Sequence, residues 1–381
     1  MSERDAASSL VSQFSPLQPI VCSPHEKTPL ALMTAAELIG RLPTSECKRV
    51  PAGTVGAFVS ESSLTAYPIV GRIVHFLEED TLRLSETQDV SSRGLDSDSE
   101  SIKRSVKQWY DEFGWKRNES GVYGDTGLFS QLSLTAHGIY ELFSHLSLLD
   151  RLTGGEFVLD AASGAIPHPE YLAYSWFYKY RVCVDMSRTA LQETDAKLVG
   201  RGFCCLADIC RLPFKEGVFD AAVSGYTIQH IPESQQSQAV GELYRVLKPG
   251  GHLCVISGIQ LPRAHQALLT AMRAVRKIQK ILGIISRRII LEPSRAGGSS
   301  TPPHKLYYLE RDLRWWREMA RSLTDAHTLE GFRLFRKEEF QLLFGESARA
   351  AKVVRALETL FPRLAAKMCA YVLVDLEKPS S

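Results

Sequence analysis

One stretch near the middle of the chain, residues 157–167, limits the fold more than any other part of the sequence. It reads Phe-Val-Leu-Asp-Ala-Ala-Ser-Gly-Ala-Ile-Pro, an apolar run that ends in Asp160, then a turn of small residues, then Pro167. A short apolar run before a turn predicts a buried strand, and proline is tolerated in the first turn of a helix because its missing N–H needs no partner there. The stretch therefore predicts a strand, a tight turn and a helix that begins at Pro167.

Further segments repeat the pattern of an apolar strand with an acid at one end. Strands that alternate with helices predict right-handed βαβ units in a parallel sheet, and such sheets bind ligands beyond the carboxyl ends of their strands. Ser187 is placed to cap a helix and Gly200 to end it. The expected elements are strand 180–184 before Asp185, helix 187–198, strand 202–207 before Asp208, strand 218–224 with Asp220, helix 233–247 and strand 252–257.

This ordered series resembles the class I S-adenosylmethionine-dependent methyltransferases, and within them the type 11 methyltransferase domains. The matching motifs are Val-Leu-Asp-Ala-Ala-Ser-Gly, Val-Cys-Val-Asp-Met-Ser, Leu-Ala-Asp-Ile-Cys-Arg-Leu-Pro-Phe, Phe-Asp-Ala-Ala-Val-Ser and Glu-Leu-Tyr-Arg-Val-Leu-Lys-Pro-Gly-Gly, over roughly residues 103–260. The resemblance implies an α/β fold with a Rossmann-like seven-stranded sheet covered by helices on both faces. It also implies S-adenosyl-L-methionine as the cofactor.

The resemblance assigns cofactor contacts by position. Asp160 would orient the turn and the cofactor's amino-acid end, and Asp185 would hold the ribose hydroxyls. Asp208 and Ile209 would hold the adenine, and Tyr226 would lie beside the sulfonium. The full expected set is Asp160, Ala161, Ala162, Ser163, Gly164, Asp185, Met186, Ala207, Asp208, Ile209, Ser224, Gly225 and Tyr226.

The turn departs from the family pattern at two places. The family usually has glycine where this chain has Ala162 and Ile166, so Gly164 alone remains. Alanine costs little if its φ is negative, but a β-branched residue does not tolerate positive φ. We therefore expect the backbone to turn differently at Ile166, through a loop rebuilt around Pro167-His-Pro169.

His230, just past the fourth strand, is the candidate catalytic residue. A histidine there could act as a general base, although lining the cofactor site is the favoured interpretation. The residues expected to contact the acceptor are aromatic or imidazole side chains: Tyr110, Tyr123, His168, Tyr226, His230, His304 and Tyr307. Asp220 is expected to be structural. The tetrapeptide Asn-Pro-Pro-Tyr, which marks methylation of amino groups on bases, is absent after the fourth strand.

Residues 19–80 predict a small N-terminal α+β domain, which resembles the Trm112-like domains. That family often carries a zinc site with four cysteines, and a tetrahedral site needs four N or S ligands. Cys22 and His25 keep the first spacing, but residues 59–63 lack cysteine and histidine. We expect no metal, and a role either as a scaffold that docks substrate or as a passive remnant.

The remaining segments complete the expected organisation. Residues 1–18 are predicted to be a disordered leader, 81–102 an acidic, Ser-rich linker, and 103–378 the methyltransferase domain with a lid insertion at 260–325. Residues 262–291 carry seven Lys/Arg and no acid. A basic amphipathic helix is typical of contact with a membrane surface or an acidic partner, but a helix docked on the core with a solvated basic side is the favoured alternative.

We therefore predict methyl transfer from S-adenosylmethionine to the O, N or C atom of a small-molecule acceptor in a cytoplasmic protein whose oligomeric state the sequence does not specify. A net charge of +2 gives no global case for nucleic-acid binding. The alternatives are a regulatory binding protein with the methyltransferase fold, and a dinucleotide oxidoreductase, against which Asp208 and the Lys-Pro-Gly-Gly turn argue.

Overall fold

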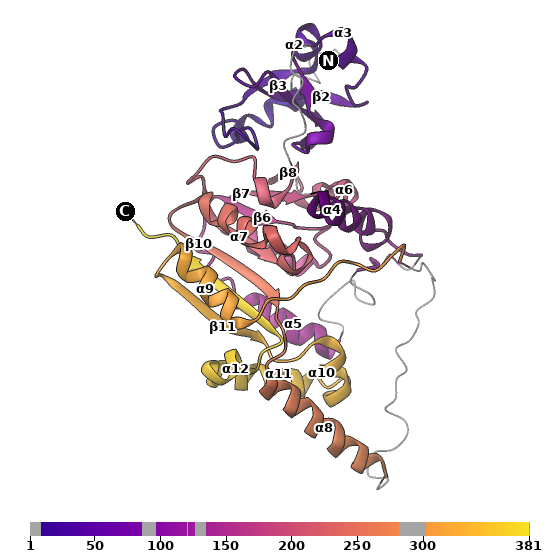
Figure 1. Ribbon diagram of the computed structural model, residues 1–381, viewed down its shortest axis with the longest axis vertical. Helices are drawn as coiled ribbons and strands as arrows, with labels where there is room; N and C mark the ends of the chain where they lie inside the picture. Colours follow the sequence, from indigo (N-terminus) through magenta and orange to yellow (C-terminus); the bar gives the residue numbers. More distant parts are fainter. Residues whose placement is uncertain (1–8, 86–96, 120, 126–134, 282–301, 381) are drawn as a thin grey trace.

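A single twelve-stranded sheet runs through the molecule (Figure 1). The computed structural model describes residues 9–85, 97–119, 121–125, 135–281 and 302–380. Its central strands, in spatial order, are β8 (Gly202–Leu206), β7 (Tyr178–Asp185), β6 (Gly155–Ala161), β9 (Phe219–Gly225), β10 (Leu247–Gly258), β12 (Tyr371–Glu377) and β11 (His327–Arg333). Neighbours from β8 to β10 are parallel, whereas β12 is antiparallel to both β10 and β11. The predicted seven-stranded methyltransferase sheet is confirmed.

Helices cover both faces of this sheet because successive side chains of each strand point to opposite sides. On β6, Phe157 and Leu159 pack in a cluster with α7 and α9, whereas Val158 packs in a second cluster on the other face. The same alternation on β7 places Cys183 against α6. The helices around the sheet are α4 (Ser97–Trp109), α5 (Ala136–Leu146), α6 (Arg188–Leu198), α7 (Gln236–Arg245) and α9 (Leu313–Leu323).

The strand order creates a switch point beside β6. The chain proceeds from β6 to β7 and β8 on one side, then crosses to β9 and β10 on the other. The loops after β6 and β9 therefore diverge and leave a crevice at the carboxyl ends of these strands, where open α/β sheets bind their ligands.

The helix predicted from Pro167 does not form, and a short 3₁₀ helix at Pro169–Ser175 takes its place. Pro167 and Pro169 explain the difference, because the residue before a proline is pushed out of the α region. His168, between them, is extended, with φ −116° and ψ 125°.

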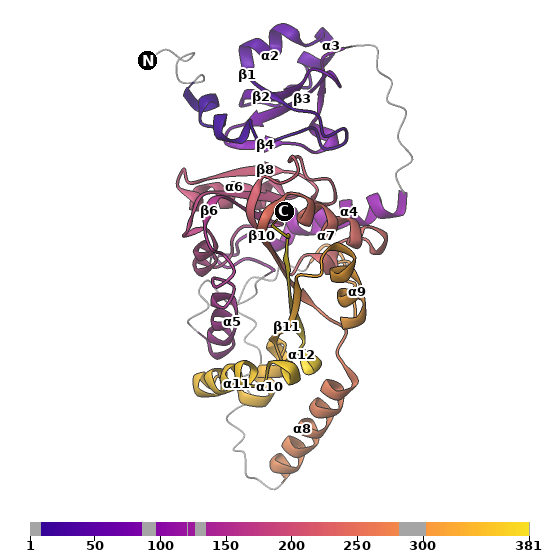
Figure 2. The same cartoon turned by 90° about the vertical axis from the view of Figure 1, so that its left-hand side faces the viewer.

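The N-terminal strands continue the same sheet instead of forming a separate one. β4 pairs in parallel with β8, joining Ile73 to Cys204 and His75 to Leu206 (Figure 2). The strands of this part are β1 (Ala31–Thr34), β2 (Thr54–Ser60), β3 (Thr65–Val70), β4 (Ile73–His75) and β5 (Leu82–Arg83), with helices α2 (Ala35–Arg41) and α3 (Thr44–Cys47). The boundaries predicted for a small domain at 19–80, and its likeness to Trm112, stay predictions.

The predicted leader and linker are only partly correct. Within the leader, Phe14 and Leu17 are buried in the main core, and the Phe14 ring lies 6.0 Å from that of Phe203. These apolar side chains offset the cost of ordering residues 9–18. Within the linker, α4 already begins at Ser97, and the hydroxyl of Ser99 is 3.0 Å from that of Ser234. Residues 1–8 and 86–96 lie outside the described residues.

The predicted lid at 260–325 stays a prediction, and residues 282–301 of it lie outside the described residues. Only Tyr308 among the described residues of this segment lines the main cavity, and α8 (Arg263–Ile281) extends away from the sheet (Figure 1). Trp316 of this segment is fully buried in the core, because α9 packs that face on the sheet. The side of the cavity beyond β9 is closed by α5, β11 and α10 (Lys337–Phe344).

The basic helix divides into two parts. Leu268 and Leu269 pack with Phe335 and Phe340, beside α11 (Ala348–Leu360) and α12 (Pro362–Met368). Further along α8, Val275 is 54% exposed and Lys277 is exposed. The core-docked interpretation holds for the first turns, and contact with a membrane or an acidic partner stays a prediction. Among the described helices, none is long and apolar enough to cross a membrane.

All eight cysteines are free thiols, and seven of them are buried. Burial raises the pKa of the thiols at Cys183 and Cys369 to about 12, so these side chains fill the core as neutral groups. In the described part of the chain, no group of three or more His, Cys, Asp or Glu side chains is placed to hold a metal ion.

Candidate cofactor and acceptor site

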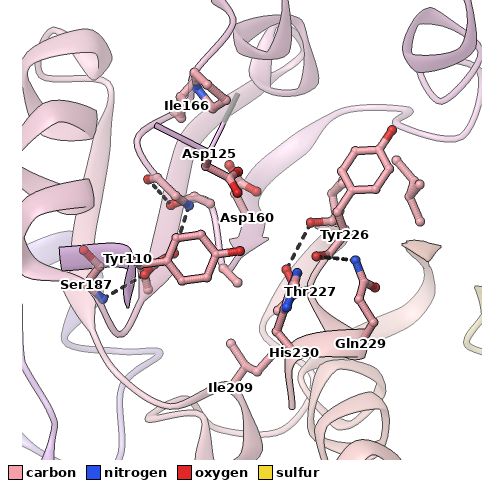
Figure 3. A pocket seen from close by; sticks show the side chains of 18 of the residues that line it. Tyr110, Asp125, Asp160, Ile166, Ser187, Ile209, Tyr226, Thr227, Gln229 and His230 are labelled. Atoms are coloured by element: carbon pink, nitrogen blue, oxygen red, sulfur yellow. Dashed lines mark hydrogen bonds between the residues drawn. The ribbon is translucent and has the colours of Figure 1, made fainter. Parts of the chain in front are cut away.

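The main cavity opens at the carboxyl ends of β6, β7, β8 and β9, where the strand order predicts a ligand site. Its volume is about 420 Å³, within the range of small-molecule pockets. Asp160, Ile209, Tyr226, His230 and Tyr110 lie around it (Figure 3). The cavity has two ends. One lies at the ends of β6, β7 and β8, and the other is formed by α5, β11 and the residues that follow β9.

The turn after β6 keeps a left-handed backbone at all three positions where the family usually has glycine. The φ angles are 56° at Ala162, 55° at Gly164 and 45° at Ile166. The expectation that the backbone turns differently at Ile166 is therefore wrong. Left-handed φ costs a non-glycine residue on the order of 1–2 kcal/mol. The Ile166 side chain, 1% exposed among Leu191, Leu206 and other apolar residues of the α6 face, offsets this strain by its burial.

Gly164 is the one position of the turn where no side chain fits. A Cβ there would collide with the indole of Trp115, which stacks on Tyr110 at a ring distance of 5.4 Å. Tyr110, expected to contact the acceptor, therefore lies above the cofactor turn. The indole of Trp115 thus packs directly on the backbone of the turn, and Trp115, Tyr110 and Gly164 all line the main cavity.

Asp185 connects the end of β7 to this turn. Its carboxylate accepts hydrogen bonds from the amides of Gly164 (2.9 Å) and Ser187 (2.8 Å). Burial raises the pKa of Asp185 to about 6, although both amide hydrogen bonds oppose that effect. Asp185 lines the cavity, so its remaining lone pairs are available to a diol, as predicted for ribose.

Asp208 follows β8 and is held from two sides. Its Oδ2 pairs with the ammonium of Lys103 at 2.5 Å, and its Oδ1 accepts from the amide of Cys210 at 2.8 Å. Lys103, from α4, is 5% exposed and lines the cavity beside Ile209. Sequence reasoning missed Lys103, because nothing in the spacing along α4 indicates that it reaches a carboxylate so far along the chain.

Asp160 has a more structural role than expected. Its Oδ2 accepts from the guanidinium of Arg181, with Nε at 3.0 Å, and Arg181 is 2% exposed. Arg181 also donates to the carbonyl of Tyr171. Asp160 thus holds β7 and the 3₁₀ helix in place, and contact with the cofactor's amino-acid end stays a prediction.

Two expected cofactor residues do not line the cavity. Ala161 and Ser224 are fully buried, whereas Val223 and Gly225, the neighbours of Ser224, do line it. Alternation along the strand explains this difference. The others expected to contact cofactor all line the cavity: Asp160, Ala162, Ser163, Gly164, Asp185, Met186, Ala207, Asp208, Ile209, Gly225 and Tyr226.

Some of the residues predicted to contact the acceptor line the main cavity, and others do not. Tyr110, His168, Tyr226 and His230 line the main cavity, but Tyr123 lines a smaller neighbouring one. His304 lies outside, with its Nε2 2.8 Å from the Ser105 hydroxyl. Tyr307 contributes only its carbonyl, which lies 2.9 Å from Nδ1 of His230, while Tyr308 lines the cavity in its place.

His230 lies at the boundary between the two ends of the cavity. Its ring packs edge-on against Tyr110 and Tyr308. Burial lowers the pKa of His230, and the contact with the Tyr307 carbonyl opposes this only in part. The imidazole is therefore neutral at physiological pH. Its proton-accepting role stays a prediction.

The far end of the cavity is lined by side chains that sequence reasoning did not identify. They come from α5, the 3₁₀ helix, β11, α10 and β12, and include Glu141, His145, Tyr171, Tyr174, Arg333, Lys337 and Tyr371. None lies in a recognisable motif. The sequence signal that could have indicated this end is the i, i+4, i+8 spacing of His137, Glu141 and His145, which places all three on one face of a helix.

Comparison with known proteins agrees with this geometry. Residues 159–255 match the family model of the methyltransferase domain. The match spans β6 to β10, so it includes the turn, Asp185 and Asp208. Residues 159–255 are therefore similar to a methyltransferase domain.

Curated relatives match short parts of the chain. It is 33% identical over 103 residues to the ubiquinone/menaquinone biosynthesis C-methyltransferase UbiE of Desulfotalea psychrophila, which covers 27% of this chain and 41% of that protein. It is 25% identical over 174 residues to the demethylmenaquinone methyltransferase of Mycolicibacterium vanbaalenii, which covers 45% of this chain and 65% of that protein. The chain thus matches less than two thirds of the length of these relatives.

Solved structures also match. The YcgJ protein of Bacillus subtilis is 16% identical, with a TM-score of 0.38, over 64% of this chain and 99% of that one. The geranyl diphosphate C-methyltransferase of Streptomyces coelicolor is 14% identical, with a TM-score of 0.39, over 62% of this chain and 75% of that one.

Proposed function

We propose that this protein transfers a methyl group from S-adenosylmethionine to a small-molecule acceptor. The observation that carries the proposal is one cavity with two chemically different ends. The end before β9 combines the left-handed turn, Asp185 and Asp208, and the end beyond β9 is lined by polar and aromatic side chains. An electrophilic methyl group placed between them would lie next to Gly225 and Tyr226.

The residues of the first end have separate tasks in this proposal. Asp185 accepts the ribose hydroxyls, and Asp208, held by Lys103, accepts the adenine amine. Ile209, 5% exposed, packs on the adenine face. S-adenosylmethionine supplies a methyl group that reacts by in-line displacement, so most of the rate enhancement comes from holding the acceptor in line with it in a space without water.

The acceptor class follows from the second end and from the relatives. Tyr171, Tyr174, Tyr226 and Tyr371 bring four aromatic rings to this end, with ring distances of 5.8 Å between Tyr171 and Tyr174 and 5.5 Å between Tyr226 and Tyr371. One curated relative is named as a C-methyltransferase of ubiquinone/menaquinone biosynthesis, and another as a demethylmenaquinone methyltransferase. We therefore infer that the acceptor is a ring compound with hydroxyl groups, methylated on oxygen or on a ring carbon.

Titration calorimetry with S-adenosylmethionine and with NADH tests the proposal. We expect micromolar or tighter binding of S-adenosylmethionine and weak or undetectable binding of NADH. Tight binding of NADH alone would instead support an oxidoreductase. Binding of S-adenosylmethionine without transfer to any acceptor would support the regulatory alternative, which the strained turn at Ala162 and Ile166 keeps open.

The N-terminal strands have a supporting role in this proposal. β4 lies along β8, whose end carries Asp208, and Arg72 pairs with Asp195 of α6 at 2.9 Å. The strands thus hold β8, which is followed by Asp208, and α6, which begins three residues after Asp185. Deletion of residues 1–80 is expected to lower cofactor affinity and thermal stability together, and an unchanged affinity would contradict this role.

A further inference from the structure

The acceptor end of the cavity contains a buried cluster of ionisable side chains, here called the Glu141 cluster: Glu141, His145, Tyr171, Tyr226 and Arg333. Arg333 Nη1 lies 3.2 Å from Oε2 of Glu141, and its Nη2 donates to the hydroxyl of Tyr226 at 2.9 Å. Tyr171 donates to Oε1 of Glu141 at 3.0 Å. Nε2 of His145 lies 3.0 Å from the hydroxyl of Tyr226 and 3.1 Å from that of Tyr171.

The charge states in this cluster follow from its contacts. Burial raises the pKa of Glu141, but the guanidinium of Arg333 outweighs burial, and that pKa lies well below its ordinary value. Burial lowers the pKa of His145, and Glu141 opposes this only in part. At neutral pH the cluster therefore holds a carboxylate, a guanidinium and a neutral imidazole.

The donors and acceptors then assign a direction to the hydrogen bonds. A guanidinium can only donate, so the oxygen of Tyr226 accepts from Arg333. The hydroxyl hydrogen of Tyr226 is then free to point at Nε2 of His145, which accepts when its proton is on Nδ1, next to the hydroxyl of Tyr174. This leaves a lone pair on the Tyr226 oxygen for a further donor.

Tyr226 is placed between the cofactor end and the buried histidine. It directly follows β9, with φ 57°, a left-handed conformation that is uncommon and costly for a bulky residue. Its side chain is partly exposed and lines the cavity, pointing away from Ile209 (Figure 3). His145, which contacts the Tyr226 hydroxyl, is 4% exposed. Strain of this kind persists where the surrounding structure fixes a side chain for a specific task.

We propose that Tyr226 and His145 form a proton relay that removes the proton from a hydroxylated aromatic acceptor, with Arg333 and Glu141 as positioning residues. The inference rests on the proposed function. In the step, the acceptor oxygen or ring carbon bonds to the methyl carbon as the carbon–sulfur bond breaks and the electron pair stays on sulfur. The acceptor's hydroxyl proton moves to the oxygen of Tyr226, and the proton of Tyr226 moves to Nε2 of His145. Attack by a ring carbon gives the keto form of the product, which becomes aromatic again when the hydrogen on that carbon moves to the oxygen.

The charges balance in this step. The positive charge lost from sulfur appears on the His145 imidazolium, whose Nε2 lies 3.7 Å from Oε1 of Glu141. The other groups that face His145 are the hydroxyls of Tyr171 and Tyr174, the ring of His168 and the guanidinium of Arg333. Only Glu141 among them is an anion, so it stabilises the imidazolium until solvent takes the proton.

The relay is tested by comparing a protonated acceptor, which needs a base, with an ionised acceptor, which does not. The variants are Tyr226→Phe and His145→Gln, each assayed for single-turnover methyl transfer to 1,4-naphthalenediol, which is protonated, and to 4-nitrophenol at mildly alkaline pH, where it is ionised. We expect a loss of roughly 10²- to 10⁴-fold with the diol, the usual range for a general base, and a much smaller loss with nitrophenolate. Cofactor affinity, measured by calorimetry, should stay within about threefold of the unchanged protein.

Matched controls come from groups outside the cavity. Tyr180→Phe removes a hydroxyl from β7 among Phe157 and Phe203, and His252→Gln removes an imidazole that pairs with Asp375. Both should leave transfer unchanged. The rate with the diol should also rise with pH in the unchanged protein and lose this dependence in Tyr226→Phe.

Each remaining outcome contradicts a definite statement. Equal losses with both acceptors in Tyr226→Phe would show that Tyr226 has a structural role only, and would overturn the relay. Cofactor binding without transfer to either compound would overturn the proposed acceptor class. Absence of S-adenosylmethionine binding would overturn the proposed function itself.

Discussion

The two ends of the cavity are built in different ways. The cofactor end uses residues next to strand ends, such as Asp185 and Asp208, each placed by the strand before it. The acceptor end is assembled from α5, the 3₁₀ helix, β9 and β11, and its central contact joins Glu141 to Arg333 across most of the domain. The difference teaches that local sequence order can specify a cofactor site, whereas an acceptor site depends on tertiary packing of distant segments.

The strongest test of the cofactor end is Asp185→Ala. We expect affinity for S-adenosylmethionine to fall at least about 100-fold, because the ribose loses its acceptor and the amides of Gly164 and Ser187 lose theirs. Calorimetry measures the affinity, and circular dichroism checks the fold. Asp325→Ala, which removes an exposed carboxylate before β11 that does not line the cavity, is the matched control. Unchanged affinity in Asp185→Ala would contradict the ribose assignment.

Ile166→Gly tests how the turn bears its strain. Glycine relieves the left-handed φ of 45° but removes a side chain that is 1% exposed. Loss of such a side chain typically costs 2–5 kcal/mol, so we expect a net destabilisation of about 2–3 kcal/mol in chemical denaturation. A stabilised variant would show that strain, and not burial, dominates at this position.

The cofactor end should also depend on pH. Because burial raises the pKa of Asp185 to about 6 from the ordinary 3.8, the folded protein takes up a proton in this range that the unfolded chain does not. The ionised form of Asp185 is the one that accepts the ribose hydroxyls, and its population falls as pH falls below 6. Affinity for S-adenosylmethionine should fall about tenfold per pH unit there. Asp185→Asn should bind weakly at every pH, and a flat profile in the unchanged protein would contradict the assignment.

The smallest expected effect is that of Ala162→Gly. This position has φ 56° but is only partly buried, so glycine relieves strain and removes little packing. We expect a stabilisation of about 0.5–1 kcal/mol, since the greater freedom of glycine in the unfolded chain offsets part of the gain. Cofactor affinity should not change. If Ala162→Gly stabilises the protein and Ile166→Gly destabilises it, burial of the side chain offsets the backbone strain at Ile166 but not at Ala162.

The sequence predicted the sheet, because apolar strands with acids at their ends carry a local signal, and most residues expected to bind cofactor line one cavity. The predictions failed where packing overrides local preference. Ile166 adopts a left-handed φ that its side chain disfavours, and Pro167 and Pro169 prevent the expected helix. The acceptor end could not be predicted, because the contact of His145 with Tyr226 depends on how α5 docks beside β9, and no spacing in the chain specifies that docking.

The pairing of β4 with β8 has a consequence for how the chain folds as it is synthesised. Without β4, strand β8 would be an exposed edge with unpaired backbone groups, the kind of edge that promotes aggregation. The N-terminal strands leave the ribosome first, so their own edge stays open until β6, β7 and β8 have been made. Contacts between segments this distant along the chain slow folding. In the native state, β4 and β8 thus cover each other's edge. Early in synthesis this protection is missing, because β8 has not yet been made.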